Sequence, residues 1–154
     1  MTRLSQHCMG AILMSDTVFM LKPDAYYKRE EILELVGSKH PIVTYQEFEM
    51  SRELFFGLYS RYIDTPLDAL FEYLSENACV VATCAISIDK LMKISGTNID
   101  PSLCDVGTIR REYGLGYGVT RSGLSIIRNA IHRPKNVAES EEQLNIFRKH
   151  KLSV

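Results

Sequence analysis

The stretch that most constrains the fold is Cys79 to Ile86, which is apolar at almost every position. Successive side chains of a strand point to opposite faces of a sheet, so a run that is apolar throughout predicts a strand covered on both faces. We therefore expect a sheet with this strand at its centre. Cys79 and Cys84 lie an odd number of positions apart, which places them on opposite faces and argues against a shared metal ion or a disulfide between them.

Composition and charge exclude several classes of protein. The 154 residues are 45% hydrophobic, which suits one globular domain. The formal net charge of -1 provides no broad basic surface for nucleic acid or for an acidic membrane. No stretch approaches the ~20 apolar residues of a membrane span. None of the 4 cysteines stands in a CxxC motif, so we expect reduced thiols in a cytoplasmic protein.

Periodicity predicts the order of helices and strands within a domain that covers residues 17–148. Residues 1–16 are expected to form a flexible extension and residues 149–154 a frayed polar tail. Residues 96–123 show no period and are expected to form a long loop. Strands are expected at 17–21, 42–50, 79–86 and 126–132. Helices are expected from about 28 to 37 with Ile32, Leu35 and Val36 on one face, from an N-cap at Ser51 to 62, from 66 to 76, at 88–92, and last with Ser140, Leu144 and Phe147 facing the core.

The order of these elements is strand, helix, strand, helix pair, strand, short helix, loop, strand and helix. This is a βαββαβ pattern with additions. It predicts a ferredoxin-like α+β sandwich, in which a four-stranded antiparallel sheet has helices packed on one face. The fold by itself says little about function, so function has to be inferred from particular side chains.

Three short segments carry side chains suited to phosphate chemistry. Lys22–Ala25 follows the first strand, Gly107–Arg110 lies in the glycine-rich loop, and Asn129–His132 ends the last strand. Arginine binds phosphate through a planar fork of donors, and imidazole offers a nitrogen lone pair near neutral pH. Together, and in this order, the three segments resemble the nucleoside diphosphate kinases. The resemblance covers about residues 17–148.

The resemblance implies an activity and an assembly. Members of this family transfer the γ-phosphate of ATP, or of another nucleoside triphosphate, to a nucleoside diphosphate by a ping-pong mechanism through a phosphohistidine. His132 would be the nucleophile, and the δ nitrogen of its ring would take the phosphate. Mg²⁺ would arrive on the nucleotide phosphates, so no metal site on the protein is expected. The resemblance also implies a homo-oligomer, commonly a hexamer, that requires neither nucleic acid nor a membrane.

The same resemblance assigns roles to the residues around the imidazole. Arg110 and Thr97 would hold the phosphates. Lys22 and Asn129 would bridge the ribose hydroxyls and the phosphates. Tyr59 would lie beside the imidazole and the transferred phosphate.

This chain departs from the family pattern at several nucleotide contacts. The helix position that usually carries a phosphate-binding arginine aligns with Leu91, with only two lysines nearby, and the aromatic that stacks on the base aligns with Leu67. The glutamate that orients the histidine aligns with Gln143, whose amide can accept the ring N–H without a charge, at a cost on the order of 1 kcal/mol. Pro134 stands where a serine usually supports the ring.

The spacing within the last motif makes a geometric prediction. Asn129 and His132 lie an odd number of positions apart, so a regular strand would turn their side chains to opposite faces. If both line one site, the backbone must leave regular β geometry by His132. We therefore predict irregular φ and ψ angles at His132, as is common at functional sites.

Two other functions fit parts of the sequence. The departures could leave a weakened member of the family that binds nucleotides as a regulatory or interaction module, without turnover. RNA-recognition domains share the βαββαβ order, but they carry stacking aromatics on their central strands and a basic surface. The stretch 79–86 has no aromatic residue and the net charge is -1, which argues against this class.

Overall fold

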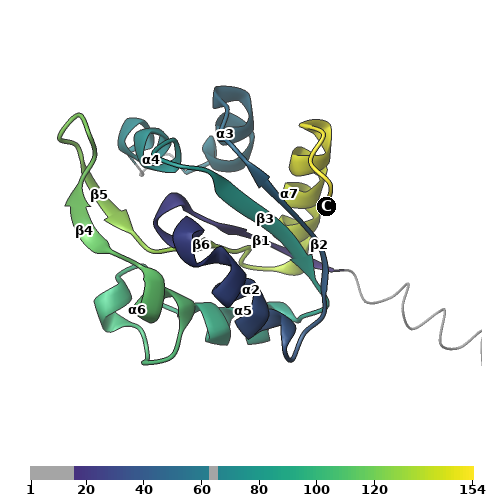
Figure 1. Cartoon of the computed structure of the whole chain (residues 1–154). Helices are drawn as coiled ribbons and strands as arrows, with labels where there is room; N and C mark the ends of the chain where they lie inside the picture. The colour runs from purple at the N-terminus through teal and green to yellow at the C-terminus, as the bar shows by residue number, and fades with distance from the viewer. Residues whose placement is uncertain (1–15, 63–65) are drawn as a thin grey trace, which may run out of the picture.

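An antiparallel sheet and the helices around it form the part of the chain that the structure describes. The structure is a computed structural model and describes residues 16–62 and 66–154 (Figure 1). Its strands are β1 (Thr17–Leu21), β2 (Ile42–Phe48), β3 (Cys79–Cys84), β4 (Gly116–Val119), β5 (Ser125–Arg128) and β6 (Ile131–His132). Its α-helices are α2 (Arg29–Gly37), α3 (Arg52–Tyr59), α4 (Leu67–Leu74), α5 (Ile88–Ser95), α6 (Ile109–Tyr113) and α7 (Val137–Lys149), and its 3-10 helices are η1 (Pro23–Lys28) and η2 (Pro101–Leu103).

The main sheet has the predicted ferredoxin-like topology. Its 4 strands pair in the order β2-β3-β1-β6, and every pairing is antiparallel. The apolar run that begins at Cys79 forms β3, an inner strand with all of its residues buried. Strand β2 lies at an edge of the sheet, and its burial alternates along the strand as a half-exposed strand requires.

Helices cover both faces of this sheet, so the prediction of helices on one face only is wrong. Helices α3, α4 and α7 lie on one side, and α2, α5 and α6 lie on the other (Figure 1). The reason is that the inner strands are apolar on both faces: Met20 packs with the first group of helices and Phe19 with the second. Cys79 and Cys84 lie in these two different clusters, as their spacing predicted.

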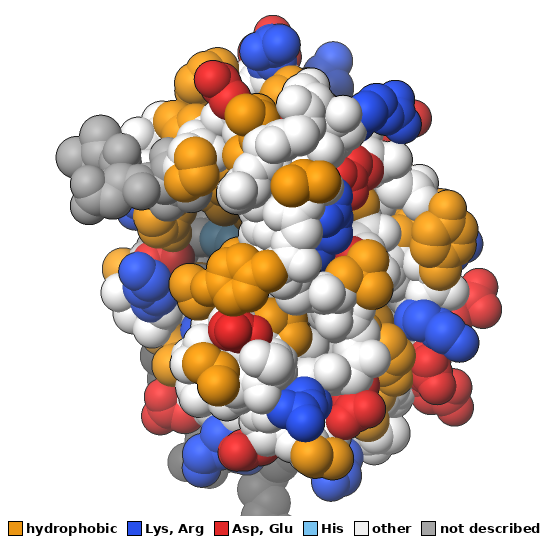
Figure 2. Space-filling model, turned by 90° about the vertical axis from the view of Figure 1, so that its left-hand side faces the viewer, with side chains coloured by type: hydrophobic (Ala, Val, Ile, Leu, Met, Phe, Trp, Pro, Cys, Tyr) orange, Lys and Arg blue, Asp and Glu red, His pale blue; other side chains and the backbone are white. Residues whose placement is uncertain are grey.

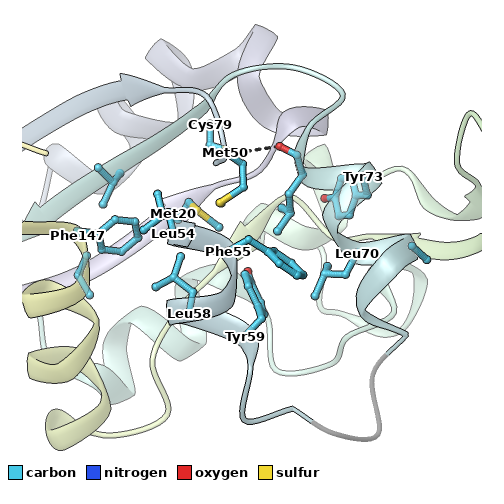
Figure 3. Close-up of a cluster of buried hydrophobic side chains, with 14 of the residues drawn as sticks. Met20, Met50, Leu54, Phe55, Leu58, Tyr59, Leu70, Tyr73, Cys79 and Phe147 are labelled. Carbon is cyan, nitrogen blue, oxygen red and sulfur yellow. Dashed lines mark hydrogen bonds between the residues drawn. The ribbon is translucent and has the colours of Figure 1, made fainter. Parts of the chain in front are cut away.

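The cluster under α3, α4 and α7 is rich in aromatic and sulfur-containing side chains (Figure 3). Helix α3 begins as predicted at Ser51, whose Oγ accepts a hydrogen bond of 3.1 Å from the backbone N–H of Leu54. The ring of Phe55 stacks on Tyr59, with 5.2 Å between the centroids. Helix α3 therefore packs as one wall of the core and carries Tyr59 toward the end of β6.

The segment at 96–123 is not the structureless loop that we expected. It contains η2, α6 and β4, and β4 pairs with β5 in a separate two-stranded sheet. Helix α6 is 5 residues long, too short to show a hydrophobic period, and begins where the Thr108 side chain accepts from the backbone N–H of Arg111. Arg110 therefore lies on a helix and not in a loop. The segment at 126–132 is correspondingly divided between β5 and β6.

Two details of the helical faces also differ from expectation. Leu35 of α2 is 44% exposed, and Leu33 packs against the core while Ile32 and Val36 are buried as predicted. After α7 the tail is packed and not frayed: Leu152 and Val154 contact the core, because the chain turns back over the helix. Residues 1–15, most of the expected extension, lie outside the described residues. In the ranges 16–62 and 66–154, no helix has both the length and the hydropathy to span a membrane.

Candidate active site

His132 stands at the end of β6, directly opposite Met20 of β1. Its imidazole packs edge-on against the ring of Tyr59, with 5.2 Å between the ring centroids and 65° between the planes. Tyr59 is buried, whereas His132 keeps part of its surface open. Figure 2 views the molecule from the side of the β4–β5 hairpin and shows hydrophobic side chains spread over this face. His132 is thus partly accessible and packs closely against Tyr59.

The backbone leaves strand geometry just before His132. Ala130 has a φ of 68°, and the backbone N–H of Ile131 donates to the carbonyl oxygen of Asn129 at 2.7 Å, as in a γ-turn. The predicted irregularity is therefore present, but it falls at Ala130 and not at His132. The turn changes the direction of the chain between β5 and β6, which is why the odd spacing does not separate Asn129 from the site.

Asp24 holds this turn, and sequence analysis gave it no role. Its Oδ2 accepts from the backbone N–H of Ala130 at 3.0 Å, and its Oδ1 accepts from the hydroxyl of Tyr73. The backbone N–H of Lys22 donates to the carbonyl oxygen of Ala130 at 2.8 Å. A residue with φ near 70° is strained unless its surroundings fix it, and these bonds do so. An acidic residue three positions after the end of a buried strand was the signal that could have identified Asp24.

Lys22 and Asn129 are hydrogen-bonded to each other next to β6. The Nζ of Lys22 donates to Oδ1 of Asn129 at 2.8 Å, and Nδ2 of Asn129 donates to the carbonyl oxygen of Ile99 at 3.2 Å. Both side chains are buried. Burial, and to a lesser extent the nearby charge of Arg110, lowers the pKa of Lys22 to about 8. Lys22 is therefore close to losing its proton at neutral pH, and an anionic ligand would stabilise its charged form.

Arg110 approaches the site from α6. Its Nη1 donates to the carbonyl oxygen of Asn98 at 2.8 Å and its Nη2 to that of Ile131 at 3.3 Å, while its buried Nε has no hydrogen-bond partner in the described structure. Burial lowers the pKa of this guanidinium to about 10. Thr97 is exposed and directly precedes Asn98, so Arg110 also fixes the turn on which Thr97 lies.

On the side of the His132 ring that faces α7, several buried polar atoms lack hydrogen bonds within the described residues. The Nε2 of His132 and the Oε1 of Gln143 are both buried without a hydrogen-bond partner among the residues described, and so is the hydroxyl of Tyr59. Gln143 donates through Nε2 to Glu139 at 3.1 Å. Burial first, then the charge of Lys22, lowers the pKa of His132 to about 3, and the Gln143 side chain opposes this shift. The imidazole is therefore neutral at physiological pH, with the Gln143 amide close to it.

The two leucines aligned with nucleotide contacts lie in different surroundings. Leu91 is fully buried in the core beneath α5, so its prediction as a nucleotide contact is wrong: α5 turns this position toward the sheet. Leu67 begins α4 and lines a groove of about 390 Å³ with Arg52, Phe55 and Phe71. The residues that line this groove do not include those that surround the imidazole.

The donor set at the site fits phosphate better than a metal ion. Its charged groups nearest the imidazole are cations, and cations attract oxyanions and repel metals. Within the described residues, no group of 3 or more histidine, cysteine, aspartate or glutamate side chains is arranged to hold a metal.

The fold and the site together consist of an antiparallel ferredoxin-like sheet, a histidine on its edge strand β6, and the buried cations Lys22 and Arg110 near that histidine. The family model described as "Nucleoside diphosphate kinase" matches residues 15–152. The chain belongs to the nucleoside diphosphate kinase family, and the resemblance identified in the sequence is confirmed. A comparison with curated protein sequences found no match.

Solved structures agree with the fold. The nucleoside diphosphate kinase from Encephalitozoon cuniculi is 23% identical, with 87% of this chain and 88% of that chain covered and a TM-score of 0.71. The enzyme from Aquifex aeolicus is 20% identical, covers 86% of this chain and 94% of its own, and has a TM-score of 0.72. The enzyme from Borrelia burgdorferi, described as a transition-state mimic with bound vanadate and ADP, is 20% identical, with 86% of both chains covered and a TM-score of 0.71.

Proposed function

We propose that this protein is a nucleoside diphosphate kinase that transfers the γ-phosphate of ATP through a phosphohistidine on His132. The observation that carries the proposal is a neutral, partly accessible imidazole beside the buried cations Lys22 and Arg110. A neutral imidazole has the lone pair that a nucleophile needs, and the cations offset charge on the phosphate oxygens. The bound vanadate and ADP of the Borrelia burgdorferi relative are consistent with such a site.

The proposed chemistry needs little from the protein beyond position and charge. With a proton on Nε2 facing Oε1 of Gln143, the lone pair of His132 lies on Nδ1. A bond forms between Nδ1 and the γ-phosphorus as the bond to the bridging oxygen breaks, and the nucleoside diphosphate leaves with that electron pair. A second nucleoside diphosphate then attacks the phosphohistidine through a terminal phosphate oxygen and restores the imidazole.

The remaining contacts in the proposal follow the placement of the side chains. Thr97 donates to a phosphate oxygen, Lys22 and Asn129 bridge the phosphates and ribose, and Tyr59 packs beside the imidazole. Leu67 is proposed to form the aliphatic edge of the base site at the start of α4. Mg²⁺, carried on the nucleotide, supplies further positive charge to the phosphates.

We also propose that the protein assembles as a homo-oligomer, with a hexamer as the expected size. Large exposed hydrophobic residues occur throughout the segment 99–124: Ile99, Leu103, Val106, Leu115, Tyr117, Val119 and Leu124. Hydrophobic side chains are also visible on the face that carries the β4–β5 hairpin (Figure 2). Apolar surface of this kind is typical of subunit contacts. Light scattering would measure the assembly size.

We also propose that the protein is located in the cytoplasm, and the free thiols of Cys79, Cys84 and Cys104 are consistent with this location.

The first experiment is phosphorylation followed by a chase. The purified protein is incubated with γ-labelled ATP and Mg²⁺, isolated, and mixed with unlabelled GDP, with His132→Ala as the control. We expect acid-labile label on the protein, absent from His132→Ala and transferred to GTP by the chase. A protein that binds ATP in calorimetry but takes up no label would contradict the proposed turnover. That result would favour a nucleotide-binding regulatory module, which the unsatisfied Gln143 and Tyr59 also suit.

A further inference from the structure

Arg133, the residue after the proposed nucleophile, turns its side chain back to the end of α5. Its Nε donates to Oγ of Ser95 at 2.9 Å, and its Nη2 donates to the carbonyl oxygen of Gly96 at 3.2 Å. Ser95 is fully buried, and its own hydroxyl donates to the carbonyl oxygen of Leu91. The guanidinium is thus attached to buried groups of α5 and is itself only half-buried.

Arg133 and Arg110 hold the same short turn from two sides. Arg133 binds the carbonyl oxygen of Gly96, and Arg110 binds that of Asn98. Thr97 lies between these two residues and is exposed. The charge of Arg133 also lowers the pKa of Arg110 and that of His132, so the two guanidinium groups act on each other and on the imidazole. A guanidinium has five N–H donors, and only two of those of Arg133 have partners in the described structure.

Lys22, Arg110 and Arg133 form no ion pair within the part of the chain that the structure describes. The ion pairs found there involve Arg29, Arg61 and Arg128, and none involves Lys22, Arg110 or Arg133. Acidic groups act on them only from greater distance: Asp24 on Lys22, and Glu139 on Arg133. Like charges gathered without a carboxylate destabilise one another, and an oxyanion between them relieves the repulsion.

The other cations near α5 are less well placed. Lys90 and Lys93, the lysines closest in sequence to Leu91, are exposed, and Leu91 is buried. Arg133, which directly follows β6, contacts the C-terminal end of α5 through Ser95, one helical turn after Leu91. Its free donors therefore remain available beside Thr97.

We propose that Arg133 is a substrate-binding residue that donates to a phosphate oxygen of the bound nucleoside di- or triphosphate, beside Thr97 and Arg110. The inference rests on the proposed function for the identity of the ligand, a polyphosphate ester. Ser95 is a positioning residue in this arrangement, because it acts by orienting the guanidinium. The planar fork of arginine suits a phosphate, and a lysine would replace only its charge.

The test measures binding and not turnover. Isothermal titration compares the wild-type protein, Arg133→Gln and the control Arg111→Gln, with ADP and with inorganic tripolyphosphate as probes. Arg111 is an exposed arginine on the same helix as Arg110, so its replacement controls for net charge. We expect Arg133→Gln to lower the affinity for both probes by about 10- to 100-fold, which is the range for the loss of a hydrogen bond to a charged group. Arg111→Gln should change affinity less than threefold, and Arg133→Lys should recover part of the loss.

A second variant separates a binding role from a structural one. Ser95→Ala should weaken the binding of ADP. Combining it with Arg133→Gln should reduce the affinity little further than Arg133→Gln alone, because both changes act through one guanidinium. Additive losses, or affinities of Arg133→Gln within twofold of wild type, would each overturn the inference. If the expected pattern holds but no phosphohistidine forms with labelled ATP, only the proposed function fails. If the wild-type protein binds neither probe, both fail.

Discussion

His132 separates two groups of side chains that the fold supports differently. On the phosphate flank, Lys22, Arg110 and Asn129 bond to one another or to backbone carbonyls, and only the Nε of Arg110 is left without a partner in the described residues. On the support flank, the hydroxyl of Tyr59 and the Oε1 of Gln143 are buried, and neither finds a hydrogen-bond partner in the part of the chain described.

The difference indicates where this site is preorganised. A buried polar atom without a hydrogen bond costs about 1–3 kcal/mol, so the support flank lowers stability. The support flank contacts His132 through the ring of Tyr59, which packs against the imidazole. The phosphate flank keeps its cations in place before any ligand arrives. We therefore expect substitutions on the phosphate flank to reduce affinity and rate, and suitable substitutions on the support flank to be neutral or beneficial.

The largest effect is expected for Arg110→Lys, which keeps the charge but removes the fork that reaches Asn98 and Ile131. We expect kcat/KM for nucleotide transfer to fall about 100-fold, equivalent to about 2.7 kcal/mol. Arg111→Lys is the matched control on the same helix and should behave as wild type. Steady-state kinetics would measure both. A loss below threefold in Arg110→Lys would show that the phosphate flank does not depend on this fork.

The next effect is a pH dependence of binding on the same flank. In the free protein the pKa of Lys22 is about 8, and bound phosphates favour its protonated form. Affinity for ADP should therefore decrease as pH rises through 8, becoming about tenfold weaker at pH 9 than at pH 7.5. Lys22→Arg cannot lose its proton in this range and should give a flat profile. Calorimetry across this range would test it, and equal slopes for the two proteins would refute the role of Lys22.

On the support flank, the double variant Glu139→Gln, Gln143→Glu exchanges an amide and a carboxylate that already bond to each other. The carboxylate then faces Nε2 of His132, favours a proton there and raises the pKa of the ring. We expect phosphohistidine formation to become up to about tenfold faster in rapid-quench measurements. Glu139→Gln alone controls for the lost charge. A slower double variant would mean that the support flank is already optimal.

The smallest effect is expected for Tyr59→Phe. The hydroxyl of Tyr59 is buried and bonds to nothing described, so its removal should raise the free energy of unfolding by up to about 1 kcal/mol and change the rate less than threefold. Tyr62→Phe is the control, because the hydroxyl of Tyr62 donates to Glu139 and its loss should lower stability. Urea unfolding gives both values. A tenfold slower Tyr59→Phe would instead place this hydroxyl on the substrate.

The sequence predicted the sheet well because its strands differ clearly in pattern. The apolar run at Cys79 required an inner strand, and the capping serine at Ser51 located the start of α3. It did not predict α6, because a helix of 5 residues shows no period. It also joined β5 and β6 into one strand, because a turn at Ala130 without glycine or proline gives no sequence signal.

By itself, the sequence determined the fold class, the order of the elements outside the segment 96–132, and the set of motifs that identifies the family. These depend on local pattern and on residue types that a single chain displays. Only the tertiary structure decided that Asp24 fixes the turn before His132, that Leu91 faces the core, and that Arg133 reaches α5. Such contacts join residues far apart in the chain, and their geometry is set by how β6, α5 and α6 pack together.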